Sequence, residues 1–127
     1  MSIVYEINRD AKLVFARVVG VLTHDDIIDY QRDVWSQPEI AEYDEIVDAS
    51  AVQKIEYESS RRVNETASLA ASSDSKEHMT RLAIVAVTPE AYGLARMYQT
   101  FRETTPGNTK SVRVVRSLDE AHAWLGK

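Results

Sequence analysis

The sequence contains no cysteine, so disulfides, thiol nucleophiles and cysteine-ligated zinc are all excluded. Glycine and proline are scarce as well, at 4 and 3 of 127 residues, which argues against a disordered or linker-rich chain. Basic residues number 15 against 20 acidic ones. The resulting net charge of −5 disfavours nucleic-acid binding, because that function needs a basic face.

Long hydrophobic runs are also missing. The longest, residues 82–87, is far shorter than the roughly 20 residues that a membrane-spanning helix needs. The first residues do not show a basic stretch followed by an apolar one, so they do not read as a signal peptide. We therefore expect a cytoplasmic protein with no integral membrane segment, folded as one domain over residues 1–127.

The hydrophobic pattern predicts an α/β fold. Two alternating segments joined by a polar turn indicate an antiparallel hairpin, and later strands alternate with helices, which favours parallel pairing. Thr23, Thr88 and Ser117 are suited to cap helices. The predicted order is ββαβαβαβα, a mixed sheet with about four helices, with strands near 3–8, 13–19, 45–48, 81–87 and 111–116.

The loops that follow the parallel strands are the predicted working edge, because ligands of α/β proteins settle there. The stretch 48–62 is the strongest candidate, starting at the end of an apolar strand and leading into a helix expected to begin near residue 57. A structural alternative stays open for its members: an aspartate can cap its own loop, and a serine can cap a helix. The candidate partner or switch residues are Asp48, Ser50, Glu56, Tyr57, Glu58, Ser59 and Ser60.

Tyr92 and Arg96 lie one helical turn apart in the helix predicted over 89–102, where they could line a ligand cleft. The alternative is a surface arginine lying over a tyrosine ring. We expect no metal site, because the adjacent residues 24–26 diverge on a helix and the other histidines have no companion at ligand spacing. No phosphate-binding loop or nucleophile elbow is present, so we expect no catalytic residues and no cofactor.

Three features resemble the STAS domain superfamily, the fold of the bacterial anti-sigma-factor antagonists. Ile46-Val-Asp-Ala-Ser-Ala-Val52 is similar to that family's apolar-Asp-apolar-Ser-Gly-Val segment, and the loop to Glu56 follows at matching spacing. The ending, residues 112–125, is similar to the family's last strand and short helix. More closely, the chain resembles the divergent, sporulation-antagonist-like group, which is also similar to CRAL-TRIO lipid-binding domains.

The resemblance implies a regulatory role. In the family, the loop ends in Asp-Ser-Ser-Gly, and a partner kinase phosphorylates a serine there. Placed without gaps, the family's aspartate falls on Glu56, its serines on Tyr57 and Glu58, and its glycine on Ser59. The chain therefore departs from the family pattern at the switch itself, unless the alignment slips and Ser59 or Ser60 serves.

These observations favour two functions over a third, an enzyme that would use Glu56, Glu58 or His24. The first is a non-enzymatic bacterial interaction module that binds a protein partner through residues 48–62. The alternative is a small-molecule or lipid-binding module, with a pocket for an apolar ligand between the sheet and the helix over 89–102. A homodimer is a further open possibility.

Overall fold

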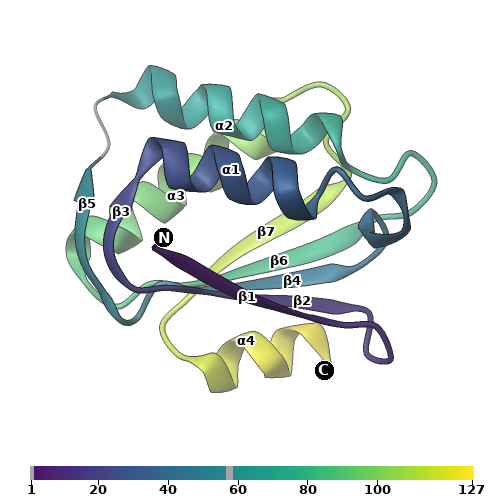
Figure 1. Cartoon of the computed structure of the whole chain (residues 1–127), viewed down its shortest axis with the longest axis horizontal. Helices are drawn as coiled ribbons and strands as arrows, with labels where there is room; N and C mark the ends of the chain where they lie inside the picture. Colours follow the sequence, from purple (N-terminus) through teal and green to yellow (C-terminus); the bar gives the residue numbers. More distant parts are fainter. Residues whose placement is uncertain (1, 57–58) are drawn as a thin grey trace.

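The structure is a computed structural model that describes residues 2–56 and 59–127 (Figure 1). Within these described residues the chain forms seven strands, four α-helices and one short 3-10 helix, η1. In chain order they are β1 (Ile3–Asn8), β2 (Leu13–Val18), β3 (Gly20–Thr23), α1 (His24–Val34), η1 (Pro38–Ile40), β4 (Asp44–Asp48), β5 (Val52–Glu56), α2 (Ser60–Ser72), β6 (Thr80–Val85), α3 (Pro89–Thr104), β7 (Lys110–Val115) and α4 (Leu118–Leu125).

Five strands form one mixed sheet in the order β1-β2-β4-β6-β7. The hairpin of β1 and β2 is antiparallel, and each of the other neighbouring pairs is parallel. The predicted α/β architecture, with its N-terminal hairpin and parallel remainder, is therefore confirmed. Its parallel strands place their carboxyl ends at Asp48, Val85 and Val115, along one edge.

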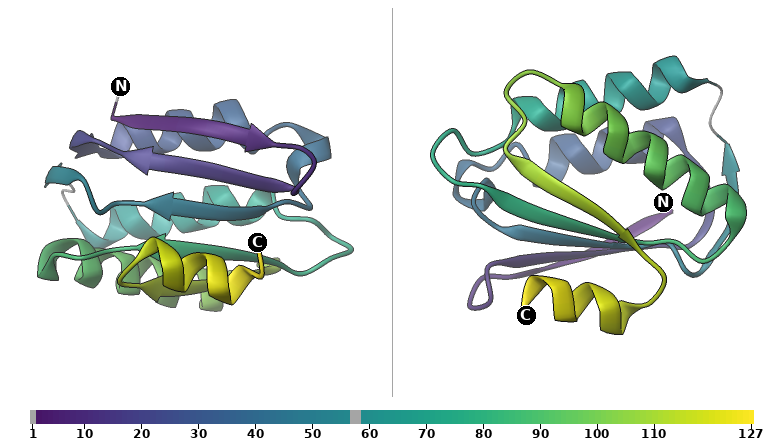
Figure 2. Two further views of the ribbon diagram at one scale, coloured as in Figure 1. Left: turned by 90° about the horizontal axis from the view of Figure 1, so that it is seen from below. Right: turned by 180° about the vertical axis from the view of Figure 1, so that it is seen from behind.

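Helices α1, α2 and α3 cover one face of this sheet, and α4 covers the other (Figures 1 and 2). Alternation along β2 explains how both faces are buried. Val14 and Ala16 join the core beneath α1, whereas Leu13 and Phe15 join the core against α4. The cavity described below lies on the face that three helices cover.

The predicted helix starts at Thr23, Thr88 and Ser117 are observed. Each side chain accepts a hydrogen bond from a backbone N–H in the first turn of its helix. This contact satisfies one of the amide groups that a helix end leaves unpaired. No helix among residues 2–56 and 59–127 is long and apolar enough to cross a membrane.

Two short strands were not predicted. Strands β3 and β5 pair in parallel as a separate ribbon, which stands at the end of the main sheet (Figure 1). Gly20, with φ of +66°, lets the chain change direction between β2 and β3. The segment predicted to be a loop therefore contains β5, and α2 begins at Ser60.

Candidate functional site

The aspartate of the predicted partner segment is buried. Asp48 is 2% exposed, and its Oδ1 accepts a hydrogen bond from the backbone N–H of Ser50 at 3.0 Å. Its Oδ2 lies 3.6 Å from Nε of Arg17. The hydrogen bond from Ser50 forms an Asx turn, so the structure gives Asp48 a role in shaping its own loop.

The other described candidate residues of that segment, Ser50, Glu56, Ser59 and Ser60, are exposed. Glu56 ends β5 and lies 3.5 Å from Nζ of Lys54, with both side chains largely exposed. Ser59 caps α2, because its Oγ accepts from the backbone N–H of Arg62 at 3.3 Å. Ser60 is exposed at the first residue of that helix. Tyr57 and Glu58 lie outside the described residues.

Tyr92 and Arg96 do not meet. The guanidinium of Arg116 lies 4.1 Å from the centre of the Tyr92 ring, and it donates to the carbonyl of Val87 at 3.3 Å. Arg96 is exposed and donates to Oε1 of Gln99 at 3.4 Å. The cation that covers Tyr92 therefore comes from the end of β7, and neither Tyr92 nor Arg96 lines the cavity beneath α3.

A cavity of about 120 Å³ lies between the sheet and helices α1, α2 and α3. Its walls are mainly aliphatic. Helix α3 contributes four side chains, and the ribbon contributes Leu22 from β3 and Ile55 from β5. The other aliphatic lining residues include Ile3, Ala16, Val18, Ile27, Val47, Ala49, Val63, Leu82 and Ile84, facing Ala91, Leu94 and Ala95 of α3.

Val47 shows that helix side chains leave this space open. It lies in β4, the central strand of the sheet, and faces the three helices, yet it is only half-buried. Several residues that line this space have small side chains, among them Ala16 on β2 and Ala91 and Ala95 on α3. Core residues in close-packed proteins leave few voids larger than a water molecule, so this space is unusual.

One end of the cavity is polar and charged. The hydroxyl of Tyr30 donates to Oε2 of Glu45 at 2.6 Å, and both residues line the cavity. Nζ of Lys110 lies 3.1 Å from Oε1 of Glu45 and 3.5 Å from the centre of the Trp35 ring. Glu45 and Lys110 are 3% and 5% exposed at the side chain, so this is a buried ion pair.

Burial raises the pKa of Tyr30 well above its ordinary value, and the neighbouring Glu45 carboxylate raises it further. The pKa of Tyr30 is therefore higher in the folded protein than in the unfolded chain. The stability that protonated Tyr30 contributes is fully present below the pKa of the unfolded chain, and it is lost as the pH rises through the pKa of the folded protein. Tyr30 therefore keeps its proton near neutral pH and holds it towards Glu45.

A second buried ion pair stands beside the first. Nη2 of Arg102 donates to both carboxylate oxygens of Asp74, at 2.8 and 2.9 Å. Asp74 Oδ2 also accepts from the backbone N–H of Thr109 at 3.0 Å. Arg102 is 1% exposed, which makes it one of the most deeply buried large side chains of the described protein.

The sequence did not reveal these buried charges as a group. Glu45 and Lys110 are 65 residues apart, and Asp74 and Arg102 are 28 apart, so no local spacing connects them. One signal was present: Glu45 interrupts an apolar strand at a position that alternation places on the inner face. A buried acid there requires a cationic partner.

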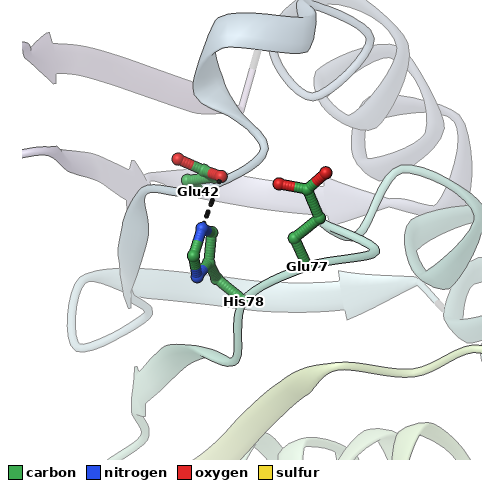
Figure 3. Close-up of side chains that lie close together, drawn as sticks. All are labelled: Glu42, Glu77 and His78. Carbon is green, nitrogen blue, oxygen red and sulfur yellow. Dashed lines mark ion pairs between the residues drawn. The ribbon is translucent and has the colours of Figure 1, made fainter.

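Three exposed side chains form a possible metal-ligating group: Glu42, which follows η1, and Glu77 and His78, which precede β6 (Figure 3). Nε2 of His78 lies 3.2 Å from Oε1 of Glu42, and Glu77 brings a third ligand atom within 4.8 Å of the others. An imidazole and two carboxylates suit zinc in kind. An exposed ion pair between His78 and Glu42 explains the contact equally well, and the expected absence of a metal stays a prediction.

Comparison with known proteins identifies the fold. A search of protein-family models found no match, and a search of curated proteins found none either. Among solved structures, the chain is similar to that of an uncharacterized protein from the DUF3478 family with a SpoIIAA-like fold, from Shewanella loihica PV-4. The match covers 98% of this chain and 93% of that one, with a TM-score of 0.61 and 17% identity. The predicted STAS-like fold is therefore confirmed, and at this identity the likeness concerns the fold alone.

Proposed function

We propose that the chain is a non-enzymatic binding module whose cavity between the sheet and helices α1–α3 holds a small apolar molecule. The cavity itself carries this proposal: about 120 Å³ of space lined mainly by aliphatic side chains, with one polar end. An engineered apolar cavity of about 150 Å³ is large enough to bind benzene. A ligand of similar size, with one polar group, suits the space described here.

The energetic cost of the cavity supports a function for it. At about 24 cal/mol per Å³, an unfilled space of 120 Å³ costs roughly 3 kcal/mol of stability. Domains of this size are stable by only about 5–15 kcal/mol in total. A larger side chain at Ala91 or Ala95 would remove much of that cost, so the small residues there suit a ligand better than they suit packing.

The polar groups at the cavity favour binding over catalysis. Thr66 donates to the carbonyl of Arg62, Tyr30 donates to Glu45, and Glu45 pairs with Lys110. Each of these polar side chains already makes a contact with another group of the protein. Among the described lining residues there is no serine, histidine or cysteine to serve as a nucleophile beside a base.

The substitution Ala95→Leu tests the proposed site. Leucine at this position projects into the cavity, so we expect at least a tenfold loss of affinity for ethylbenzene, with stability unchanged or increased. In the wild-type protein, ethylbenzene at ten times its Kd should add about 1.4 kcal/mol of stability, which is several degrees in Tm. Thermal unfolding with and without ethylbenzene measures both effects.

Ala123→Leu is the matched control. Ala123 is exposed on α4, which covers the other face of the sheet, so its replacement should leave ethylbenzene binding unchanged. Equal stabilisation by ethylbenzene in the Ala95→Leu and wild-type proteins would contradict this site. No stabilisation in the wild-type protein would contradict the proposed function.

A protein partner at residues 48–62 is the second candidate function. Strand β5 pairs with β3 on one edge, and the described residues supply no strand to its other edge. An extended peptide can add to such an edge through backbone hydrogen bonds. A partner bound there would also contact the exposed start of α2 at Ser60.

A photoreactive residue in place of Gln53 tests this surface in cells. Gln53 is exposed in the middle of β5, so we expect it to crosslink to one protein of defined mass. The same probe in place of Ala123 on α4 is the control. Identical adducts from both positions, or none from Gln53, would argue against a partner at β5.

A further inference from the structure

A second, smaller hollow adjoins the polar end of the cavity. Its volume is about 10 Å³, which is near the least that can hold one water-sized group. Gln31, Glu45 and Tyr98 line both this hollow and the main cavity. The apolar cavity and the polar hollow therefore adjoin at these three side chains.

Two buried hydrogen-bond donors at this hollow have no acceptor within the described part of the chain. They are Nε1 of Trp35 and Nε of Arg102, on residues that are 5% and 1% exposed and that both line the hollow. The Trp35 N–H lies near the Tyr30 hydroxyl without reaching hydrogen-bond geometry. A buried donor without an acceptor costs about 1–3 kcal/mol, so these two atoms favour an acceptor oxygen at this place.

The formal charge around the hollow is already balanced. Lys110 pairs with Glu45 at 3.1 Å and Arg102 pairs with Asp74 at 2.8 Å, which gives two buried cations and two buried anions. A ligand that brought a further charge would leave it without a partner in a buried site, which is strongly unfavourable. The charge balance therefore selects against carboxylates, phosphates and amines.

We infer that the cavity ligand is a neutral molecule with an apolar body and a terminal oxygen, which accepts a hydrogen bond from Trp35 Nε1 or Arg102 Nε. This inference rests on the proposed function and adds the chemical class of the ligand. The aliphatic walls take the body, and the hollow has room for a single oxygen atom. Alcohols, ketones and esters have such an oxygen, whereas free fatty acids at neutral pH are charged.

Four small probes of nearly equal size test the class of the terminal group. They are ethylbenzene, benzyl alcohol, benzylammonium and benzoate, which end in a methyl, a hydroxyl, a cation and an anion. We expect the wild-type protein to bind benzyl alcohol at least tenfold more tightly than either ion. In NMR spectra, the indole N–H signal of Trp35 should shift with benzyl alcohol and stay in place with ethylbenzene. The chain has two tryptophans, so the indole signal that remains in the Trp124→Phe variant belongs to Trp35.

Trp35→Phe removes the donor and keeps a ring against Lys110. We expect it to weaken benzyl alcohol binding by about 2- to 10-fold, the effect of one neutral hydrogen bond, and to leave ethylbenzene binding unchanged. Tighter binding of benzoate than of benzyl alcohol would overturn the inference, and so would side-chain N–H signals of Trp35 and Arg102 that both stay in place with benzyl alcohol. In either case ethylbenzene binding would still support the cavity as a site, whereas its failure to bind would overturn the proposed function itself.

Discussion

Replacing Lys110 with methionine is expected to lower the free energy of unfolding by about 3–5 kcal/mol. Methionine keeps the length of the stem and removes the ammonium group, so Glu45 is left buried without its cation. The contact between the ammonium and the Trp35 ring at 3.5 Å is lost as well. Unfolding in urea, followed by circular dichroism, measures the change.

A second substitution separates the ion pair from simple packing. In the double variant Lys110→Met with Glu45→Gln, no buried charge is left unpaired, so most of the lost stability should return. The exposed pair of Lys54 and Glu56 gives the control, since Lys54→Met should change stability by less than about 1 kcal/mol. If Lys110→Met costs no more than Lys54→Met, the buried pair does not have the role described here.

Arg102→Met is expected to destabilise the protein by a similar amount, about 3–5 kcal/mol. The guanidinium is almost fully buried and binds both oxygens of Asp74, which in turn holds the backbone of Thr109. Its removal leaves a buried carboxylate and loosens the turn that leads into β7. Urea unfolding again gives the magnitude.

The stability that returns when both partners of an ion pair are replaced should differ between the Glu45–Lys110 and the Asp74–Arg102 pairs. Adding Asp74→Ala to Arg102→Met removes the unpaired charge but leaves the Thr109 N–H without an acceptor, so recovery should be partial. Arg96→Met is the matched control, because Arg96 is exposed on the same helix and should contribute less than about 0.5 kcal/mol. Full recovery in the double variant would show that the Thr109 contact is unimportant.

Local signals in the sequence were enough to predict the main fold. Helix caps such as Thr88 and Ser117 act within one turn of the chain, and the alternation of apolar and polar residues marks β1 and β2 as strands. Strand β5 was missed because only Val52 and Ile55 are apolar in it, and three of its five residues are exposed. Its pairing with β3 depends on where the folded sheet places both segments.

The candidate site was only partly predictable. The sequence pointed to the helix over 89–102, and α3 does line the cavity, but through Ala91 and Ala95 rather than Tyr92 and Arg96. One residue along a helix is a rotation of about 100°, so the prediction named a neighbouring face. A cavity is space that side chains leave unfilled, and it depends on several elements meeting, which no single segment encodes.

The cavity also has a mechanical consequence. A volume of 120 Å³ in each molecule is about 70 mL per mole, comparable to the whole volume decrease that pressure unfolding of a small domain usually shows. Hydrostatic pressure therefore favours the unfolded chain more strongly here than in a protein whose interior is filled. A bound apolar molecule occupies that volume, so compression then meets an interior with little space left to lose.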